Sequence, residues 1–134
     1  MTRILLLAAV LAVAMPWHAY AAGDQGGGHR YLYNRDLMVP PFQSLRELFD
    51  LPNQPGSYEV TLVSDAMGPL TFKVMRVRGE RETILKQYRS YRFHNHEFHL
   101  TFDNIDGHSD LMVGIANSNP ASSARVTVIV IQLP

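Results

Sequence analysis

The sequence contains no cysteine among its 134 residues, which excludes disulfide bonds, thiolate metal sites and cysteine nucleophiles. It also lacks a surplus of either charge, because 12 Lys and Arg balance 12 Asp and Glu. Binding to nucleic acid phosphates takes an excess of basic residues, so this balance argues against a nucleic acid partner. The apolar stretch Ile4–Met15 is only about 12 residues long, whereas a membrane-spanning helix needs roughly 20.

Sequence motifs of common enzymes are missing as well. The chain has no Gly-x-Ser-x-Gly elbow, no phosphate-binding Gly-x-x-x-x-Gly-Lys and no His-Glu-x-x-His. A small hydrolase stays as a class, but no set of residues predicts a mechanism for it. We therefore expect a protein that is not an enzyme.

The first 21 residues have the pattern of a cleavable signal peptide. Arg3 supplies a positive charge, Ile4–Met15 is apolar, Pro16 interrupts the run, and Ala19-Tyr20-Ala21 is the small-x-small pattern that a signal peptidase recognises. We expect export to the periplasm or secretion, with no transmembrane anchor after processing. Removing these 21 of 134 residues leaves 113, with 11 basic and 12 acidic residues and a net charge of −1.

Two segments precede the main body of the domain. Residues 22–41 predict a flexible N-terminal segment, because Gly23–Gly28 is rich in glycine and Pro40-Pro41 lacks backbone donors. Residues 42–50 carry apolar side chains at helical spacing, so we expect one short helix there.

From Ser57 onward, apolar residues alternate with polar ones, as they do in half-buried strands. We expect one hairpin that pairs Leu62 with Phe72 around a Gly-Pro turn. A second hairpin would pair Phe102 with Leu111, because the Asp-Gly turn at position 106 tolerates the positive φ angles of a tight hairpin.

Three further segments complete the expected fold. Residues 84–91 are compatible with a helix or a strand, and their aromatic content favours the strand. A tight turn at Asn95-His96 would join this strand to the next one. Val126–Leu133 is almost continuously apolar, which predicts a central strand buried on both faces. The sequence therefore predicts an all-β protein: a single small antiparallel β-sandwich of Greek-key or jelly-roll type over residues 42–134, with about six or seven strands and a short N-terminal helix.

The first candidate site is a histidine-rich segment. His94, His96, Glu97 and His99 lie within six residues, and imidazole and carboxylate groups are ligands for Cu²⁺ or Zn²⁺. The spacing matches no strong metal motif, and Arg92 would repel a cation. A solvated polar face and a pH-responsive surface are the alternatives, since free imidazoles titrate near pH 6–7.

The second candidate site is acidic. The expected hairpin places Asp103 opposite Asp110, and like charges at opposed positions destabilise a strand pair. Ca²⁺ bound with Asp106 would relieve that repulsion, although the segment lacks the spacing of a calcium-binding loop. Simple solvation of the turn is the alternative.

The third candidate site is basic and aromatic. Seven basic residues between positions 73 and 92 are interleaved with tyrosines, and Tyr88, Arg89 and Arg92 are the candidate ligand-binding residues for an acidic glycan or a protein. The competing interpretation is a solvated strand edge, where basic side chains discourage aggregation.

These observations favour an exported, non-enzymatic interaction module. Its partner would be a protein or a glycan, or a second copy that assembles through sheet edges into a homo-oligomer. The alternative function is a periplasmic or secreted metal-binding protein that uses the histidine-rich segment for Cu²⁺ or Zn²⁺.

Overall fold

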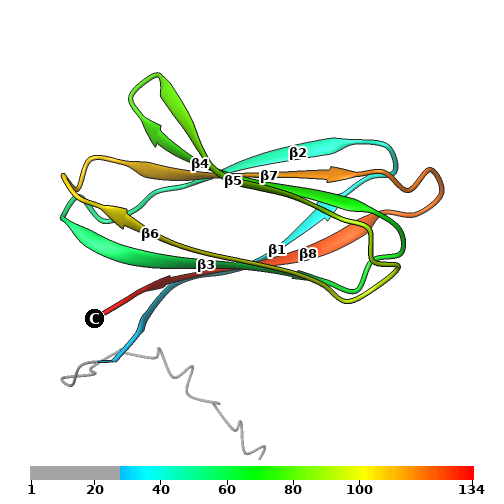
Figure 1. The fold of residues 1–134 in the computed structure, drawn as a ribbon, viewed down its shortest axis with the longest axis horizontal. Coiled ribbons are helices and arrows are strands. Elements are labelled where there is room, and N and C mark those ends of the chain that lie inside the picture. Colours follow the sequence, from blue (N-terminus) through cyan, green and yellow to red (C-terminus); the bar gives the residue numbers. More distant parts are fainter. Residues whose placement is uncertain (1–27) are drawn as a thin grey trace, which may run out of the picture.

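The computed structural model describes residues 28–134, which form eight β-strands and no helix (Figure 1). The strands are β1 (Arg30–Val39), β2 (Ser44–Phe49), β3 (Gly56–Ser64), β4 (Leu70–Arg78), β5 (Arg81–Ser90), β6 (His96–Asn104), β7 (Asp110–Asn117) and β8 (Ala124–Gln132). Among these described residues, no helix is long and apolar enough to cross a membrane. The predicted signal peptide lies outside the described residues.

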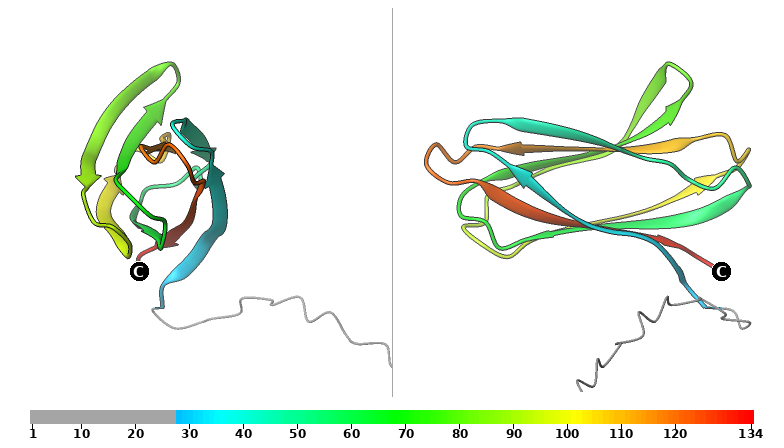
Figure 2. Two further views of the ribbon diagram at one scale, coloured as in Figure 1. Left: turned by 90° about the vertical axis from the view of Figure 1, so that its right-hand side faces the viewer. Right: turned by 180° about the vertical axis from the view of Figure 1, so that it is seen from behind.

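The strands form two antiparallel sheets that face each other (Figures 1 and 2). One sheet has the order β1-β8-β3-β6, and the other has the order β2-β7-β4-β5. The prediction of an all-β, sandwich-like fold is confirmed, with eight strands in place of six or seven.

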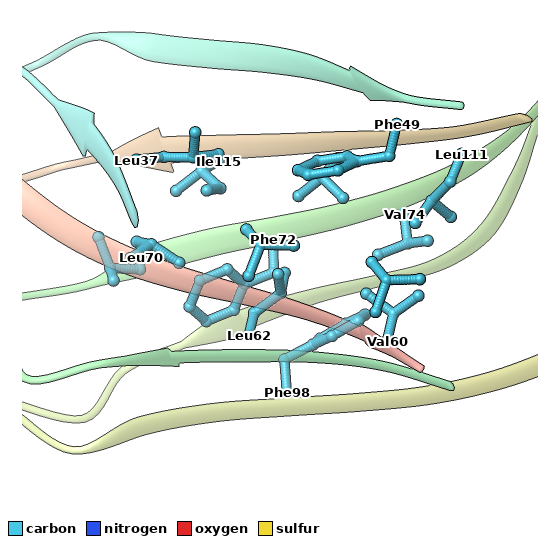
Figure 3. Packing of buried hydrophobic residues seen from close by; sticks show 14 of the residues in the cluster. Leu37, Phe49, Val60, Leu62, Leu70, Phe72, Val74, Phe98, Leu111 and Ile115 are labelled. Carbon is cyan, nitrogen blue, oxygen red and sulfur yellow. The ribbon is translucent and has the colours of Figure 1, made fainter. Parts of the chain in front are cut away.

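The core lies between the two sheets and follows from the alternation in the sequence. On β3, Tyr58, Val60 and Leu62 are fully buried at every second position, and on β4 Leu70 and Phe72 repeat the pattern. In Figure 3, Val60 and Leu62 of β3 face Phe72 and Val74 of β4 across the apolar layer between the two sheets. Burial of this apolar surface drives the two sheets together.

The C-terminal strand β8 is central, as its apolar sequence predicts. It pairs with β1 on one side and with β3 on the other. Val126, Val128 and Val130 are fully buried, while Ile129 and Ile131 are half-buried on the outer face.

Nearly every connection between consecutive strands crosses from one sheet to the other. Among the eight described strands, only β4 and β5 are neighbours both in sequence and within one sheet. The predicted hairpin between β3 and β4 is therefore wrong, because Leu62 pairs with Phe98 and Val128, whereas Phe72 pairs with Tyr88 and Ile115.

The predicted hairpin between β6 and β7 is wrong for the same reason. Phe102 pairs with Tyr58, and Leu111 pairs with Phe49 in the opposite sheet. Gly107 does have a positive φ of 72°, as the turn required, and a Cβ there would lie 2.6 Å from the backbone of Gln54. The turn is real, but it connects two sheets.

The N-terminal helix is also wrong, since residues 44–49 form strand β2. Pairing with β7 satisfies the backbone of this short segment, and only Phe49 is fully buried while Leu48 is 47% exposed. Arg30–Val39, which lies within the segment predicted to be flexible, forms β1 and pairs with β8 along its length.

The segment that was ambiguous between helix and strand is strand β5, at the edge of its sheet. The adjacent turn contains Asn95 with a positive φ of 57°, but His96 already belongs to β6. The hairpin end of β4 and β5 rises away from the two sheets (Figure 1). We call residues 76–83 the arm.

Candidate functional site

His96 is the most enclosed residue of the histidine-rich segment. It is 1% exposed, its Nδ1 lies 2.6 Å from the Ser90 hydroxyl, and its Nε2 lies 3.1 Å from the Ala66 carbonyl. Since a carbonyl only accepts, Nε2 carries the proton and the Ser90 hydroxyl donates to Nδ1. Burial lowers the pKa of His96, and the Ala66 and Gly68 carbonyls oppose this shift.

The other members of the segment point elsewhere. His94 is exposed in the connection between β5 and β6, while Glu97 and His99 lie on the outer face of β6. His99 Nδ1 lies 3.0 Å from the Thr61 hydroxyl. Within residues 28–134, no group of three or more His, Asp or Glu side chains is arranged to hold a metal ion. The structure therefore does not bring His94, His96, Glu97 and His99 together.

The second candidate site is divided as well, since Asp103 and Asp106 line one cavity at the end of β6 and Asp110 does not. Asp103 accepts a hydrogen bond of 2.5 Å from the Ser57 hydroxyl, and Asp110 accepts one of 2.9 Å from the Leu51 amide. Asp106 forms an ion pair with Arg78. Asp103 and Asp110 lie on strands of different sheets, so the expected repulsion between them does not arise.

Asp106 is held as a carboxylate by its own turn. The backbone amide of His108 donates to Asp106 at 3.1 Å, and this hydrogen bond, together with Arg78, lowers the pKa of Asp106. The Asp106 carboxylate therefore interacts with the His108 amide in the β6–β7 connection and with Arg78.

The third candidate set divides between two faces of the β5 region. Tyr88 is 45% exposed on the side of β5 that faces β6. Arg89 stacks over the ring of Tyr91, with 5.4 Å from the guanidinium to the ring centroid. Arg92 donates to the Asn95 carbonyl at 3.3 Å.

A groove between β5 and β6 brings together residues from two of the predicted sets. Its volume is about 320 Å³. Tyr88, Arg92, Glu97 and His99 line it together with Lys86, Ser90 and Phe98. We call this the β5–β6 groove, and it is the candidate functional site.

Lys86 crosses this groove and was missed in the sequence. Its ammonium donates to the His99 carbonyl at 2.8 Å and lies 4.9 Å from the centroid of the Phe98 ring. Lys86 belongs to the basic stretch of the sequence, but only the arrangement of the two sheets places it beside β6. Its alternation with Tyr88 along β5 was the available signal.

The groove is bordered by two strand edges that have no further strand beside them within residues 28–134. β5 pairs only with β4, and β6 pairs only with β3. Nine of the ten residues of β5 are exposed or half-buried, and Ser90 alone is buried. Unpaired edges present backbone donors and acceptors to any further strand.

Comparison with known proteins supports the fold alone. No protein-family model matches the chain, and no curated protein matches it. A solved structure described as "Crystal structure of PirA" is similar, with a TM-score of 0.50 and 20% sequence identity. The similarity covers 74% of this chain and 93% of that chain. At this identity, it indicates a shared all-β architecture.

Proposed function

We propose that this protein is an exported, non-enzymatic interaction module that binds an extended segment of a partner protein in the β5–β6 groove. The observation that carries the proposal is that two strand edges along one groove are unpaired in the described part of the chain. An extended segment can add to either edge through its backbone, which is a common mode of peptide recognition.

The side chains of the groove suit such a segment. Tyrosine and arginine are enriched at protein interfaces, and Tyr88 and Arg92 both line this one. Lys86 and Arg92 supply positive charge, so acidic side chains are expected in the partner segment.

We further propose that the sandwich is a jelly roll. Its two four-stranded sheets have the orders β1-β8-β3-β6 and β2-β7-β4-β5, and the strands cross between sheets at every connection except β4–β5. Eight strands wound in this manner correspond to the double-sheet arrangement of jelly rolls.

Selection from a random peptide library tests the proposed function. Peptides enriched on the purified protein should bind the Tyr88→Ala/Arg92→Ala variant at least about tenfold more weakly, since both side chains lie in the groove. The matched control is Tyr31→Ala/Arg125→Ala, which removes the same two residue types from the exposed surface of β1 and β8. This control should retain the wild-type affinity.

Two results would contradict the proposal. Enriched peptides that bind the groove variant as tightly as the wild type would place recognition elsewhere. Failure to enrich any peptide would remove the extended protein segment as the ligand.

The alternative function, a Cu²⁺ or Zn²⁺ protein, has no supporting arrangement of ligands within residues 28–134.

A further inference from the structure

A second cavity lies beneath the arm, at the end of the sandwich where β6 meets β7. Its volume is about 340 Å³, at the lower end of the roughly 300–1,000 Å³ typical of small-molecule pockets. Arg76, Arg78, Arg81 and Thr83 line it from the arm, and Asn104 lines it from the end of β6. We call it the arm cavity.

The arm crowds positive charge on the face that borders this cavity. Arg78 and Arg81 occupy directly opposed positions of the β4–β5 pair, and Arg76 is opposite Thr83 one step along the same face. Like charges at opposed positions repel each other. Arg78 forms an ion pair with Asp106, whereas Arg81 has no ion pair within residues 28–134.

The acidic residues of the cavity do not offset this charge in full. Asp106 is committed to Arg78 and to the His108 amide, and Asp103 accepts from the Ser57 hydroxyl. The guanidinium of Arg76 donates one hydrogen bond of 3.3 Å, which goes to the backbone carbonyl of Asp103 and not to its carboxylate. Three guanidinium groups therefore face two carboxylates that already have partners.

Two buried polar atoms in the lining residues lack partners. Arg76 Nε is a donor without an acceptor, and Asn104 Oδ1 is an acceptor without a donor, in the part of the chain that the structure describes. Asn104 is 1% exposed and is held by its Nδ2, which donates to the Ser109 carbonyl at 3.3 Å. Leaving a buried polar group unpaired is unfavourable, so a ligand that satisfied both atoms would gain from each.

The two atoms together define the chemistry of the ligand. Inorganic sulfate offers only acceptors, which suit the arginines but not Asn104 Oδ1. A hydroxyl group beside a carboxylate or sulfate offers a donor and acceptors within one small unit. Ile105 is 83% exposed at this cavity and provides an apolar contact for the C–H face of a sugar ring.

We propose that the arm cavity binds an acidic sugar unit of a glycan, with its anionic group on Arg76 and Arg81 and a hydroxyl donating to Asn104 Oδ1. This site goes beyond the function proposed for the β5–β6 groove, because the two sites share no lining residue. The arm cavity therefore binds a ligand of a different class from that of the groove.

Calorimetric titration of the purified protein tests this site with an oligogalacturonate hexamer, a sulfated hexasaccharide and neutral maltohexaose. An acidic hexasaccharide should bind and the neutral one should not. Arg81→Gln should weaken binding by about tenfold or more, the loss expected for one charge-assisted hydrogen bond. Arg125→Gln, which removes the same charge from the opposite sheet, should bind as the wild type does.

A second variant tests the wall of the cavity that Asn104 lines. Asn104→Asp preserves the size of the side chain and adds a negative charge that repels the acidic group. Its circular dichroism spectrum reports whether it folds, and a folded Asn104→Asp protein should lose binding of the acidic hexasaccharide.

Four outcomes would overturn the proposal. They are equal binding of maltohexaose, unchanged affinity in Arg81→Gln, binding of inorganic sulfate as tight as that of the acidic sugars, and tighter binding of hexaglutamate. The groove variant Tyr88→Ala/Arg92→Ala should retain acidic sugar binding. Loss of peptide binding in that variant does not predict loss of acidic sugar binding. Each of the two proposals can therefore fail without the other.

Discussion

The two long sides of the sandwich, where β1 faces β2 and where β5 faces β6, are built differently. On the β1–β2 side, the ring of Tyr33 packs edge-on against Phe49, with centroids 5.1 Å apart, and its hydroxyl donates to the Asp50 carbonyl at 2.6 Å. Arg35 and Glu47 join the same two strands at 2.7 Å. On the β5–β6 side, a groove of about 320 Å³ is lined by both strands, and Lys86 of β5 donates to the His99 carbonyl of β6.

This difference separates stability from recognition. Aromatic packing on the β1–β2 side removes apolar surface from water and fixes the first two strands on the core. On the β5–β6 side, the exposed Tyr88 and the charged side chains keep their surface available to a partner. The closed side is therefore expected to govern unfolding, and the open side to govern binding.

Truncating one aromatic residue on each side tests this division most strongly. Phe49→Ala should lower the free energy of unfolding by about 3–5 kcal/mol, because Phe49 is 1% exposed and its loss leaves a cavity. Tyr88→Ala should lower it by about 0.5 kcal/mol or less, since Tyr88 is 45% exposed. Urea denaturation followed by circular dichroism measures both. Equal losses would mean that the two sides support the fold equally.

Local patterns predicted the strands well and their partners poorly. The alternation around Val60 and the continuous apolar run of β8 placed both strands correctly, because burial on one face or two is written in the side chains themselves. Pairing Leu62 with Phe72 failed because both face the core from opposite sheets. Any two core-facing strands match in hydrophobicity, so the sequence could not distinguish a neighbour from a facing partner.

The candidate site was predicted only in part. Tyr88 and Arg92 do line the groove, with Glu97 and His99, which had been assigned to a metal. The metal prediction relied on a tight turn at Asn95-His96 that joins two neighbouring strands, whereas β5 and β6 lie in different sheets. A strand turns successive side chains to opposite faces, so His96 enters the interior while Glu97 and His99 face outward.

The next comparison is between the two connections that join the sheets on these sides, β1–β2 and β5–β6. Asn117 anchors the β1–β2 connection, because its Nδ2 donates to the carbonyls of Val39, Pro40 and Ser122 at 2.8–3.3 Å. His96 anchors the β5–β6 connection through Ser90 and Ala66. The Asn117 amide does not ionise, whereas the His96 imidazole can take up a proton.

Asn117→Ala should lower the free energy of unfolding by about 1–3 kcal/mol, because it leaves buried carbonyls without donors. The loss should be the same at pH 5 and pH 7.5, since an amide side chain does not ionise in this range. Denaturation at both pH values provides the measurement. The control is Asn34→Ala, at an exposed asparagine of β1, which should change stability by about 0.5 kcal/mol at most. A loss no larger than that of the control would show that Asn117 does not anchor the crossing.

His96 should make the other crossing sensitive to acid. Its pKa in the folded protein lies below the ordinary value of 6.5, chiefly because of burial, with Arg92 and His94 adding to the shift. The unfolded chain therefore takes up protons first, so this contribution to stability is present above pH 6.5 and is lost as the pH falls through the folded pKa.

A titration of the histidine ring signals by NMR checks this expectation. His96 should titrate below pH 6.5, and the free energy of unfolding should fall between pH 7.5 and 5. His29→Gln, at an exposed position ahead of β1, should retain that fall, whereas a folded His96→Gln protein should show a smaller one. The neighbouring pocket is lined by the other charged groups to consider, which are Asp36, Asp65, Glu97 and Arg125. A His96 signal that titrates at or above pH 6.5 would contradict the buried neutral state.

The smallest effect concerns the ion pair on the closed side. Arg35 and Glu47 are 45% and 33% exposed, so a double-mutant cycle with Arg35→Gln and Glu47→Gln should give a coupling of about 0.2–1 kcal/mol. The coupling should shrink in 1 M salt, where the Debye length is about 3 Å. The more exposed Arg46–Glu82 pair is the matched control and should couple no more strongly. A coupling above about 2 kcal/mol that persists in salt would mean that the ion pair, and not the packing of Tyr33 on Phe49, closes this side of the sandwich.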